Sequence, residues 1–207
     1  MLLSIHPLNP QPRLIQNVVE VLKSGGVIIY PTDTLYGLGC DIYNTSAIER
    51  ICRIKNINPK KAQFSFVCND LKHLSDFAKS ISNPLFRILK NSLPGPYTFI
   101  LEASKQVPKM LKSKKDTVGI RVPDHAITQS IVQALGNPIM SVSLPIENDV
   151  AYYTDPETIY QIFEKQVDLV IEGGIGGTVP STVIDCTQWP PEIIRMGAGA
   201  WDISFGG

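Results

Sequence analysis

The stretch that decides the fold is Gly26-Val-Ile-Ile-Tyr-Pro-Thr-Asp-Thr-Leu-Tyr-Gly-Leu-Gly39. It starts as a short apolar run with the β-branched pair Ile28 and Ile29, which predicts a buried strand that ends at Pro31. Three hydroxyls and one carboxylate follow at once, from Thr32, Asp33, Thr34 and Tyr36. Ligands tend to lie at the carboxyl ends of strands in α/β sheets, so this turn is a candidate binding segment. An ordinary strand exit with an Asx-type turn at Asp33 explains the same pattern.

Two glycines, Gly37 and Gly39, close this stretch. Glycine lets the backbone approach a ligand closely or adopt a positive φ, and both explanations fit here.

Composition limits the class of protein. The chain has 207 residues and is 43% hydrophobic, which predicts a sizeable core and a single domain over residues 1–207. The formal net charge is zero, so the molecule as a whole is no general polyanion binder and any basic surface must be local.

The cysteines and the N-terminus predict a cytoplasmic protein. The four cysteines are scattered without a CxxC pair, which argues against a zinc site or a disulfide framework. The start of the chain is broken by Pro7 too early for a signal peptide, and no apolar run is long enough to span a membrane.

Periodicity predicts an α/β domain with a mixed, twisted sheet. Closely spaced strands leave no room for helical crossovers, so the C-terminal strands should be antiparallel. Helices are expected at 13–24, 45–54, 71–78, 84–93, 124–135 and 158–164, with a turn at 152–157. Strands are expected at 26–30, 64–68, 97–101, 117–122, 138–143, 167–171, 182–185 and 192–195.

Polar groups lie at five predicted strand ends or loops. Thr117 and Arg121 are four residues apart on one strand and therefore face the same side, as do Ser141 and Ser143. The remaining candidates are the turn at 32–36, the loop cations Lys55 and Lys61, and Ser181 with Arg195 near the end.

Each candidate also has a structural explanation. Loop lysines are usually solvated, and strand serines often bond to neighbouring backbone. An arginine in an apolar strand needs an anionic partner, so Arg121 binds a ligand or forms an ion pair with Asp33 or Asp185. The glycines at 173–177 resemble a phosphate cradle only weakly, because no P-loop Lys-Ser/Thr accompanies them. The sequence contains neither HExxH nor GxSxG, and hydroxyls with a few cations suit the positioning of a phosphate and a small polar substrate.

Several segments together resemble the YrdC/YciO family. They are Tyr30-Pro-Thr-Asp-Thr-Leu-Tyr-Gly-Leu-Gly39, Pro94-Gly-Pro-Tyr-Thr98, Val118-Gly-Ile-Arg-Val-Pro123, Pro180-Ser-Thr-Val-Ile-Asp185 and Arg195-Met-Gly197. The resemblance covers residues 10–197 in order and implies a YrdC-like twisted open mixed sheet with flanking helices and a concave basic surface.

The resemblance also implies an activity. Members of the YrdC type are nucleotidyltransferases that make threonylcarbamoyl-AMP from L-threonine, bicarbonate and ATP, for threonylcarbamoyladenosine modification of tRNA. Mg²⁺ is expected to accompany ATP, with no tightly bound cofactor. Carried over by position, Thr34, Arg121, Ser141 and Ser181 would hold threonine. Lys55, Lys61, Thr117, Ser143 and Arg195 would lie along the nucleotide, and Lys55 and Arg121 would take part in catalysis.

Three departures separate this sequence from the family's synthases. Their Lys-x-Arg loop reads Lys55-Asn-Ile57 here, and their Ser-x-Asn reads Ser143-Leu-Pro145. A histidine usual before the next strand is absent from 61–68. These losses resemble the YciO branch. A second hypothesis is therefore a tRNA-, double-stranded RNA- or nucleotide-binding protein with little or no synthase activity, which uses Lys55, Lys60, Lys61 and the lysines at 105–115.

Overall fold

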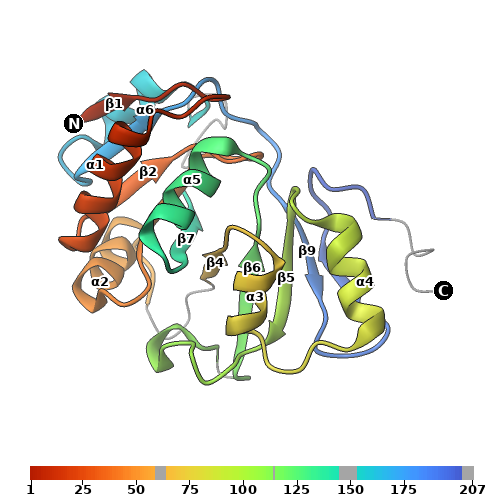
Figure 1. Cartoon of the computed structure of the whole chain (residues 1–207). Coiled ribbons are helices and arrows are strands. Elements are labelled where there is room, and N and C mark those ends of the chain that lie inside the picture. Colours follow the sequence, from red (N-terminus) through yellow and green to blue (C-terminus); the bar gives the residue numbers. More distant parts are fainter. Residues whose placement is uncertain (59–63, 114, 145–152, 202–207) are drawn as a thin grey trace.

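A single mixed sheet of ten strands organises the computed structural model (Figure 1). The structure describes residues 1–58, 64–113, 115–144 and 153–201. The strand order is β1-β8-β2-β3-β7-β4-β6-β5-β9-β10, with parallel and antiparallel neighbours. The α/β fold with a mixed open sheet predicted from the sequence is confirmed.

The elements have the following bounds. The strands are β1 (Leu2–Ser4), β2 (Ile28–Tyr30), β3 (Gly37–Asp41), β4 (Ser65–Val67), β5 (Tyr97–Glu102), β6 (Thr117–Arg121), β7 (Ile139–Ser143), β8 (Leu169–Glu172), β9 (Thr182–Asp185) and β10 (Glu192–Arg195). The helices are α1 (Pro12–Lys23), α2 (Thr45–Ile54), α3 (Leu71–Phe77), α4 (Asn83–Ser92), the 3-10 turn η1 (Lys109–Leu111), α5 (Ala126–Leu135) and α6 (Pro156–Phe163).

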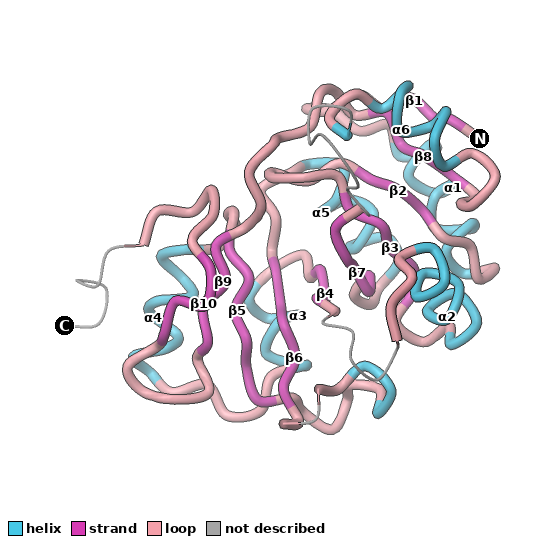
Figure 2. The backbone as a smooth tube through the Cα atoms, turned by 180° about the vertical axis from the view of Figure 1, so that it is seen from behind, coloured by secondary structure: helices cyan, strands magenta, loops and turns pink. Residues whose placement is uncertain are grey.

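Helices cover the two faces of the sheet unequally. One face packs against α2, α3, α4 and α6 in a continuous core that includes Leu38, Phe66 and Phe99. Among the described residues, the helices that cover the other face are α1 and α5, whose apolar residues pack on β2, β7 and β8. Seen from behind in Figure 2, β4, β6, β5 and β9 lie in front of α3 and α4. Part of the second face is therefore left without a helix.

Most predicted elements are confirmed within two or three residues. Helix α1 ends as expected at the glycine pair, where Gly25 has φ +86° and Gly26 donates to the carbonyl of Val21. Asn44 caps α2 by accepting from the amide of Ala47. Strands β9 and β10 are antiparallel, as their spacing predicts. The predicted turn at 152–157 lies partly outside the described residues.

Strands β1 and β3 and the turn η1 were not predicted. Gly37 and Gly39 belong to β3, which pairs with β2 on one side and β7 on the other. Neither glycine has a positive φ, so that explanation was wrong. The Asx-type turn at Asp33 was also wrong, because the Asp33 carboxylate accepts from Arg121 and from the amide of Asp124, and Thr32 instead accepts from the amide of Thr34 at 3.1 Å.

Candidate functional site

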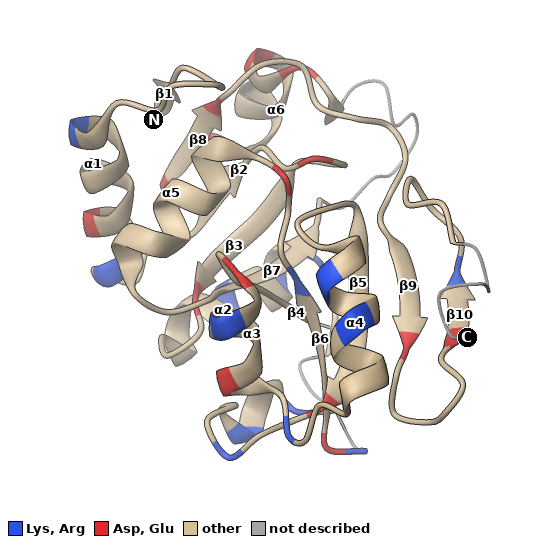
Figure 3. Ribbon diagram, turned by 45° about the vertical axis from the view of Figure 1, so that its right-hand side comes forward, with Lys and Arg blue, Asp and Glu red and all other residues tan. Residues whose placement is uncertain are grey.

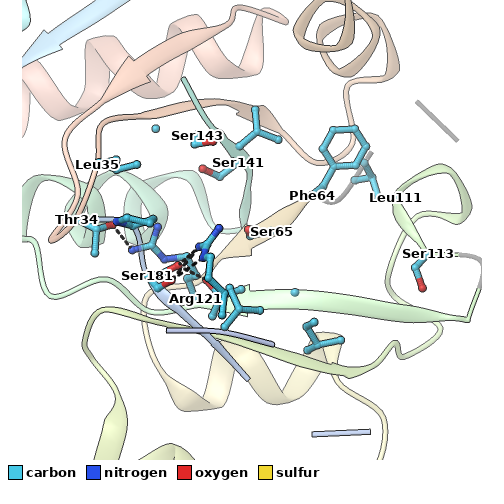
Figure 4. A pocket seen from close by; sticks show the side chains of 18 of the residues that line it. Thr34, Leu35, Phe64, Ser65, Leu111, Ser113, Arg121, Ser141, Ser143 and Ser181 are labelled. Carbon is cyan, nitrogen blue, oxygen red and sulfur yellow. Dashed lines mark hydrogen bonds between the residues drawn. The ribbon is translucent and has the colours of Figure 1, made fainter. Parts of the chain in front are cut away.

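A hollow of about 430 Å³ opens on the uncovered part of the sheet (Figure 4). Its size falls in the range of small-molecule sites, about 300–1,000 Å³. The floor follows one row of paired residues across four strands, and three of the four have small side chains or none. The row is Ser141, Ser65, Gly119 and Ile100. The hollow exists because this row does not fill the space above the sheet.

The turn between β2 and β3 forms one wall. Thr34 and Leu35 line the hollow, and the hydroxyl of Thr32 fixes the turn by donating to the carbonyl of Leu35 at 2.7 Å. The glycine-rich segment after β8 holds the same turn, since the amide of Gly177 donates to the carbonyl of Thr34 at 2.7 Å. A Cβ on Gly177 would lie 2.5 Å from that carbonyl oxygen. This segment therefore supports the wall, and the weak phosphate-cradle interpretation is unnecessary.

Arg121 joins this wall to the floor. Its Nη2 donates to Asp33 Oδ1 at 2.9 Å and to Thr34 Oγ1 at 2.8 Å. The second carboxylate oxygen of Asp33 accepts from the amide of Asp124 at 3.1 Å. Asp33, rather than Asp185, is thus the partner of Arg121, whose side chain also lines the hollow.

The Arg121 guanidinium retains unused donor capacity. Burial lowers its pKa, the Asp33 carboxylate opposes that shift, and nearby Arg195 adds to it. The buried Nε has no hydrogen-bond partner within the described part of the chain. The guanidinium lines the hollow, so an oxyanion bound beside it would be stabilised by its charge.

Arg195 reaches the hollow because β10 carries a bulge. Ile193 pairs with Ile184, but Arg195 pairs with Val183, so Ile194 is an extra residue. Val183 faces the hollow, and the bulge gives Arg195 the same face. Regular pairing would place Arg195 opposite Thr182, on the other side of the sheet.

Arg195 also fixes Ser181. Its Nη2 donates to the Ser181 carbonyl at 2.9 Å and to the Ser181 hydroxyl at 3.3 Å. That hydroxyl shares a hydrogen bond of 2.8 Å with Thr98 Oγ1. Figure 4 shows Thr34, Arg121 and Ser181 at one end of the hollow, and Phe64, Leu111 and Ser113 at the other.

Lys55 lies outside this lining. Lys55 ends α2, and its ammonium donates to the carbonyl of Leu144 at 3.2 Å, directly after Ser143. Burial lowers the pKa of Lys55. Asn56 has φ +51°, and the amide of Ile57 donates to the carbonyl of Cys52 at 3.0 Å. This helix end is a Schellman motif, and its apolar residue Ile57 packs against the core.

Seven of the nine predicted site residues lie together. The structure brings Thr34, Thr117, Arg121, Ser141, Ser143, Ser181 and Arg195 into the lining of one hollow. Lys55 is not in this lining, and Lys61 lies outside the described residues, as does Pro145. Ser65 and Thr98 were not predicted, although both stand at alternating positions of predicted strands.

The hollow is suited to anions. Among its described lining residues, only Arg121 and Arg195 carry a charge, and the rest of the polar lining is hydroxyl and backbone. Because this lining offers no carboxylate, it does not fit a Mg²⁺ ion held by the protein. The described residues likewise form no cluster of three His, Cys, Asp or Glu side chains that would hold a metal.

The fold and the hollow together agree with one protein family. Residues 20–197 match the family described as "Sua5_yciO_yrdC: Telomere recombination", and the chain belongs to this family. The resemblance stated from the sequence is therefore confirmed.

Individual relatives refine this assignment. The chain is 47% identical over 196 residues to the Escherichia coli K12 "uncharacterized protein YciO", which covers 94% of each chain. The crystal structure of E. coli YciO superposes with a TM-score of 0.91 over 100% of this chain and 98% of that one, at 45% identity.

Synthases are more distant relatives. A threonylcarbamoyl-AMP synthase of Coxiella burnetii is 31% identical over 88% of this chain and 96% of its own. The structure of Pyrococcus abyssi Sua5 complexed with L-threonine has a TM-score of 0.83 and 26% identity, over 95% of this chain and 57% of that longer one. In the described part of the present chain, no helix is long and apolar enough to cross a membrane.

Proposed function

We propose that the hollow binds L-threonine beside ATP and that the chain makes threonylcarbamoyl-AMP. The observation that carries the proposal is the Arg121 guanidinium, which lines the hollow beside the hydroxyl of Thr34. A carboxylate bound there would accept charge-assisted hydrogen bonds from it. The relative solved with L-threonine supports the choice of amino acid.

The proposed reaction has two bond-forming steps. Bicarbonate dehydrates to CO₂, and the threonine amine attacks its carbon and loses a proton, which gives a carbamate. A carbamate oxygen then attacks the α-phosphorus of ATP. The new O–P bond forms while the bond between the α-phosphorus and the bridging oxygen breaks, and pyrophosphate leaves.

The side chains of the hollow supply binding and charge in this scheme. Arg121, Thr34, Ser141 and Ser181 would hold threonine, while Thr117, Ser143 and Arg195 would contact the nucleotide. The guanidinium of Arg195 offsets the charge that develops on the phosphoryl oxygens. The described lining does not fit a protein-held Mg²⁺, so Mg²⁺ would arrive with the phosphates of ATP, and no step uses a metal site of the protein.

The isoleucine at position 57 leads us to expect weak binding of ATP. Its side chain packs inward at the end of α2, where the family's synthases carry an arginine. A lost charge-assisted hydrogen bond to a phosphate costs about 1.5–3 kcal/mol. We therefore expect a slow synthase in which threonine binding is better preserved than ATP binding.

Pyrophosphate release tests this function. The purified protein should release pyrophosphate from ATP with Mg²⁺ only when threonine and bicarbonate are both present. Arg121→Ala should abolish the release, whereas Arg87→Ala, at an exposed arginine of α4, should not change it. Calorimetry with L-threonine, with and without ATP, separates binding from turnover. Absence of threonine binding in the wild-type protein would remove the proposal.

A second candidate function is RNA binding by the lysines at the far end of the hollow. Lys105, Lys109 and Lys115 are exposed, and none forms an ion pair within the residues that the structure describes. Figure 3 shows basic segments at this lower end, where the chain runs between β5 and β6. Binding of double-stranded RNA or tRNA through them should weaken steeply as salt rises. A triple Lys→Ala variant should lose that binding and keep threonine binding.

A further inference from the structure

A buried tyrosine lies beside the hollow, on the same face of the sheet. Tyr30 ends β2, has no exposed surface, and extends across β3 toward β7. Its ring passes over two glycines: a Cβ on Gly37 would lie 3.0 Å from its Cζ, and one on Gly39 would lie 2.9 Å from its Cε1. A side chain at either position would collide with the ring. This explains why a strand inside the sheet contains glycines.

The ring ends in one hydrogen bond. The Tyr30 hydroxyl donates to Ser141 Oγ at 2.6 Å, and burial raises the pKa of Tyr30 to about 12. A phenol with this pKa keeps its proton at neutral pH and has only that proton to donate. Ser141 Oγ has no other partner in the described part of the chain, and Ser141 lines the hollow.

Proton counting then fixes the polarity of Ser141. A serine hydroxyl has one proton and two lone pairs. One lone pair accepts the hydrogen bond from Tyr30, so the Ser141 hydroxyl does not donate its own proton to Tyr30. The proton is left for an acceptor in the hollow.

Two other hydroxyls at this end also accept a hydrogen bond, although each shares a further one with a neighbouring threonine hydroxyl. Thr34 Oγ1 accepts from Arg121 at 2.8 Å, and Ser181 Oγ accepts from Arg195 at 3.3 Å. Each of the three hydroxyls therefore accepts a hydrogen bond from a neighbouring side chain. The donor is the Tyr30 hydroxyl for Ser141, and an arginine guanidinium for Thr34 and Ser181.

We infer that Tyr30 is a positioning residue that makes Ser141 a hydrogen-bond donor toward an oxyanion bound in the hollow. The inference deepens the proposed function and rests on it only for the choice of L-threonine as the ligand. Tyr30 itself contacts no ligand, because its side chain has no exposed surface and does not belong to the lining of the hollow. Its contribution must pass through Ser141.

A double-mutant cycle tests this dependence. Tyr30→Phe keeps the ring beside the two glycines and removes only the hydroxyl. We expect it to weaken the affinity for L-threonine about threefold to tenfold, the range for one neutral hydrogen bond. In a Ser141→Ala background, Tyr30→Phe should cause no further loss, because the group that it positions is absent. A purely structural role for Tyr30 would lower affinity equally in both backgrounds.

The cycle is measured by calorimetry with two probes, L-threonine and inorganic phosphate. The matched control is Tyr97→Phe, which removes a phenol that donates to the carbonyl of Ala200 at 2.8 Å, away from the hollow lining. It should leave both affinities unchanged. Thermal unfolding of every variant checks that the fold is retained.

The outcomes separate the inference from the proposed function. Loss of affinity in Tyr30→Phe that disappears in the Ser141→Ala background supports the inference. An unchanged affinity in Tyr30→Phe, or effects that simply add, overturns it and leaves threonine binding standing. Binding of phosphate without threonine removes the proposed function, and the cycle is then read on phosphate. Binding of neither probe overturns both.

Discussion

Arg121 and Asp33 form a buried ion pair, with 2.9 Å between Nη2 and Oδ1 and side chains that are 13% and 9% exposed. The pair links the turn after β2 to the end of β6, residues that are 88 positions apart in the chain. The same guanidinium lines the hollow. Ligand binding and an ion pair, the two explanations that the sequence offers for Arg121, are therefore compatible roles of one side chain.

Asp33→Asn should destabilise the protein. The substitution keeps the shape of the side chain but leaves a buried guanidinium without its counter-ion, which costs about 3–5 kcal/mol in the free energy of unfolding. Anion affinity should hold or rise, because Arg121 is then free of a competing carboxylate. Urea unfolding and calorimetry measure the two effects. Asp76→Asn, at an exposed site on α3, should change neither, and equal stability of both variants would contradict the prediction.

Arg121→Lys should separate charge from geometry. A lysine keeps a positive charge near Asp33 but lacks the planar fork of donors, including the Nε that has no partner. We expect a smaller loss of stability than in Asp33→Asn, together with about a tenfold to hundredfold loss of threonine affinity. Calorimetry at matched protein concentration measures the affinity. A lysine variant that binds like the wild type would show that Arg121 does not contact the ligand.

Alternation along strands was sufficient to predict much of the hollow. Thr117 with Arg121 and Ser141 with Ser143 share a face because side chains repeat every two residues in a strand, and the structure brings both pairs into one lining. The paired strands β9 and β10 followed from their short connection. These features depend on local spacing, which a single sequence carries.

Features decided by distant packing could not be predicted. Strand β3 was missed because Gly37 and Gly39 are poor strand formers, and the side chains that leave no room for a Cβ there, among them Tyr30 and Ile139, come from other strands. The choice between Asp33 and Asp185 as partner of Arg121 depends on the order of strands in the sheet. The inward packing of Ile57 follows from a positive φ at Asn56, which the sequence did not reveal.

Stability should fall as pH drops below about 6.5, partly through His125. The ring Nδ1 of His125 is buried without a partner in the described chain. Burial lowers the pKa of His125 from 6.5, and the carboxylates of Asp33 and Asp124 oppose this only in part. The unfolded chain therefore binds a proton more readily than the folded one, so stability rises with pH through the window below 6.5 and then levels off.

Urea unfolding at a series of pH values measures this effect. His125→Gln should show a shallower loss of stability on acidification than the wild type. His73, whose pKa is also lowered by burial, should keep contributing in that variant. An identical pH dependence in wild type and His125→Gln would show that His125 is not responsible.

Deletion of Ile194 should leave Arg195 facing the hollow. Ile194 is the extra residue of the bulge in β10 and is 55% exposed, so its side chain contributes little to the core. Without it, Arg195 directly follows Ile193, which pairs with Ile184, so regular antiparallel pairing still places Arg195 opposite Val183. The affinity for ATP and threonine, measured by calorimetry, should therefore stay near that of the wild type, whereas Arg195→Ala should lower it. A deletion variant that binds as weakly as Arg195→Ala would show that the bulge itself, and not the register of β10, directs Arg195.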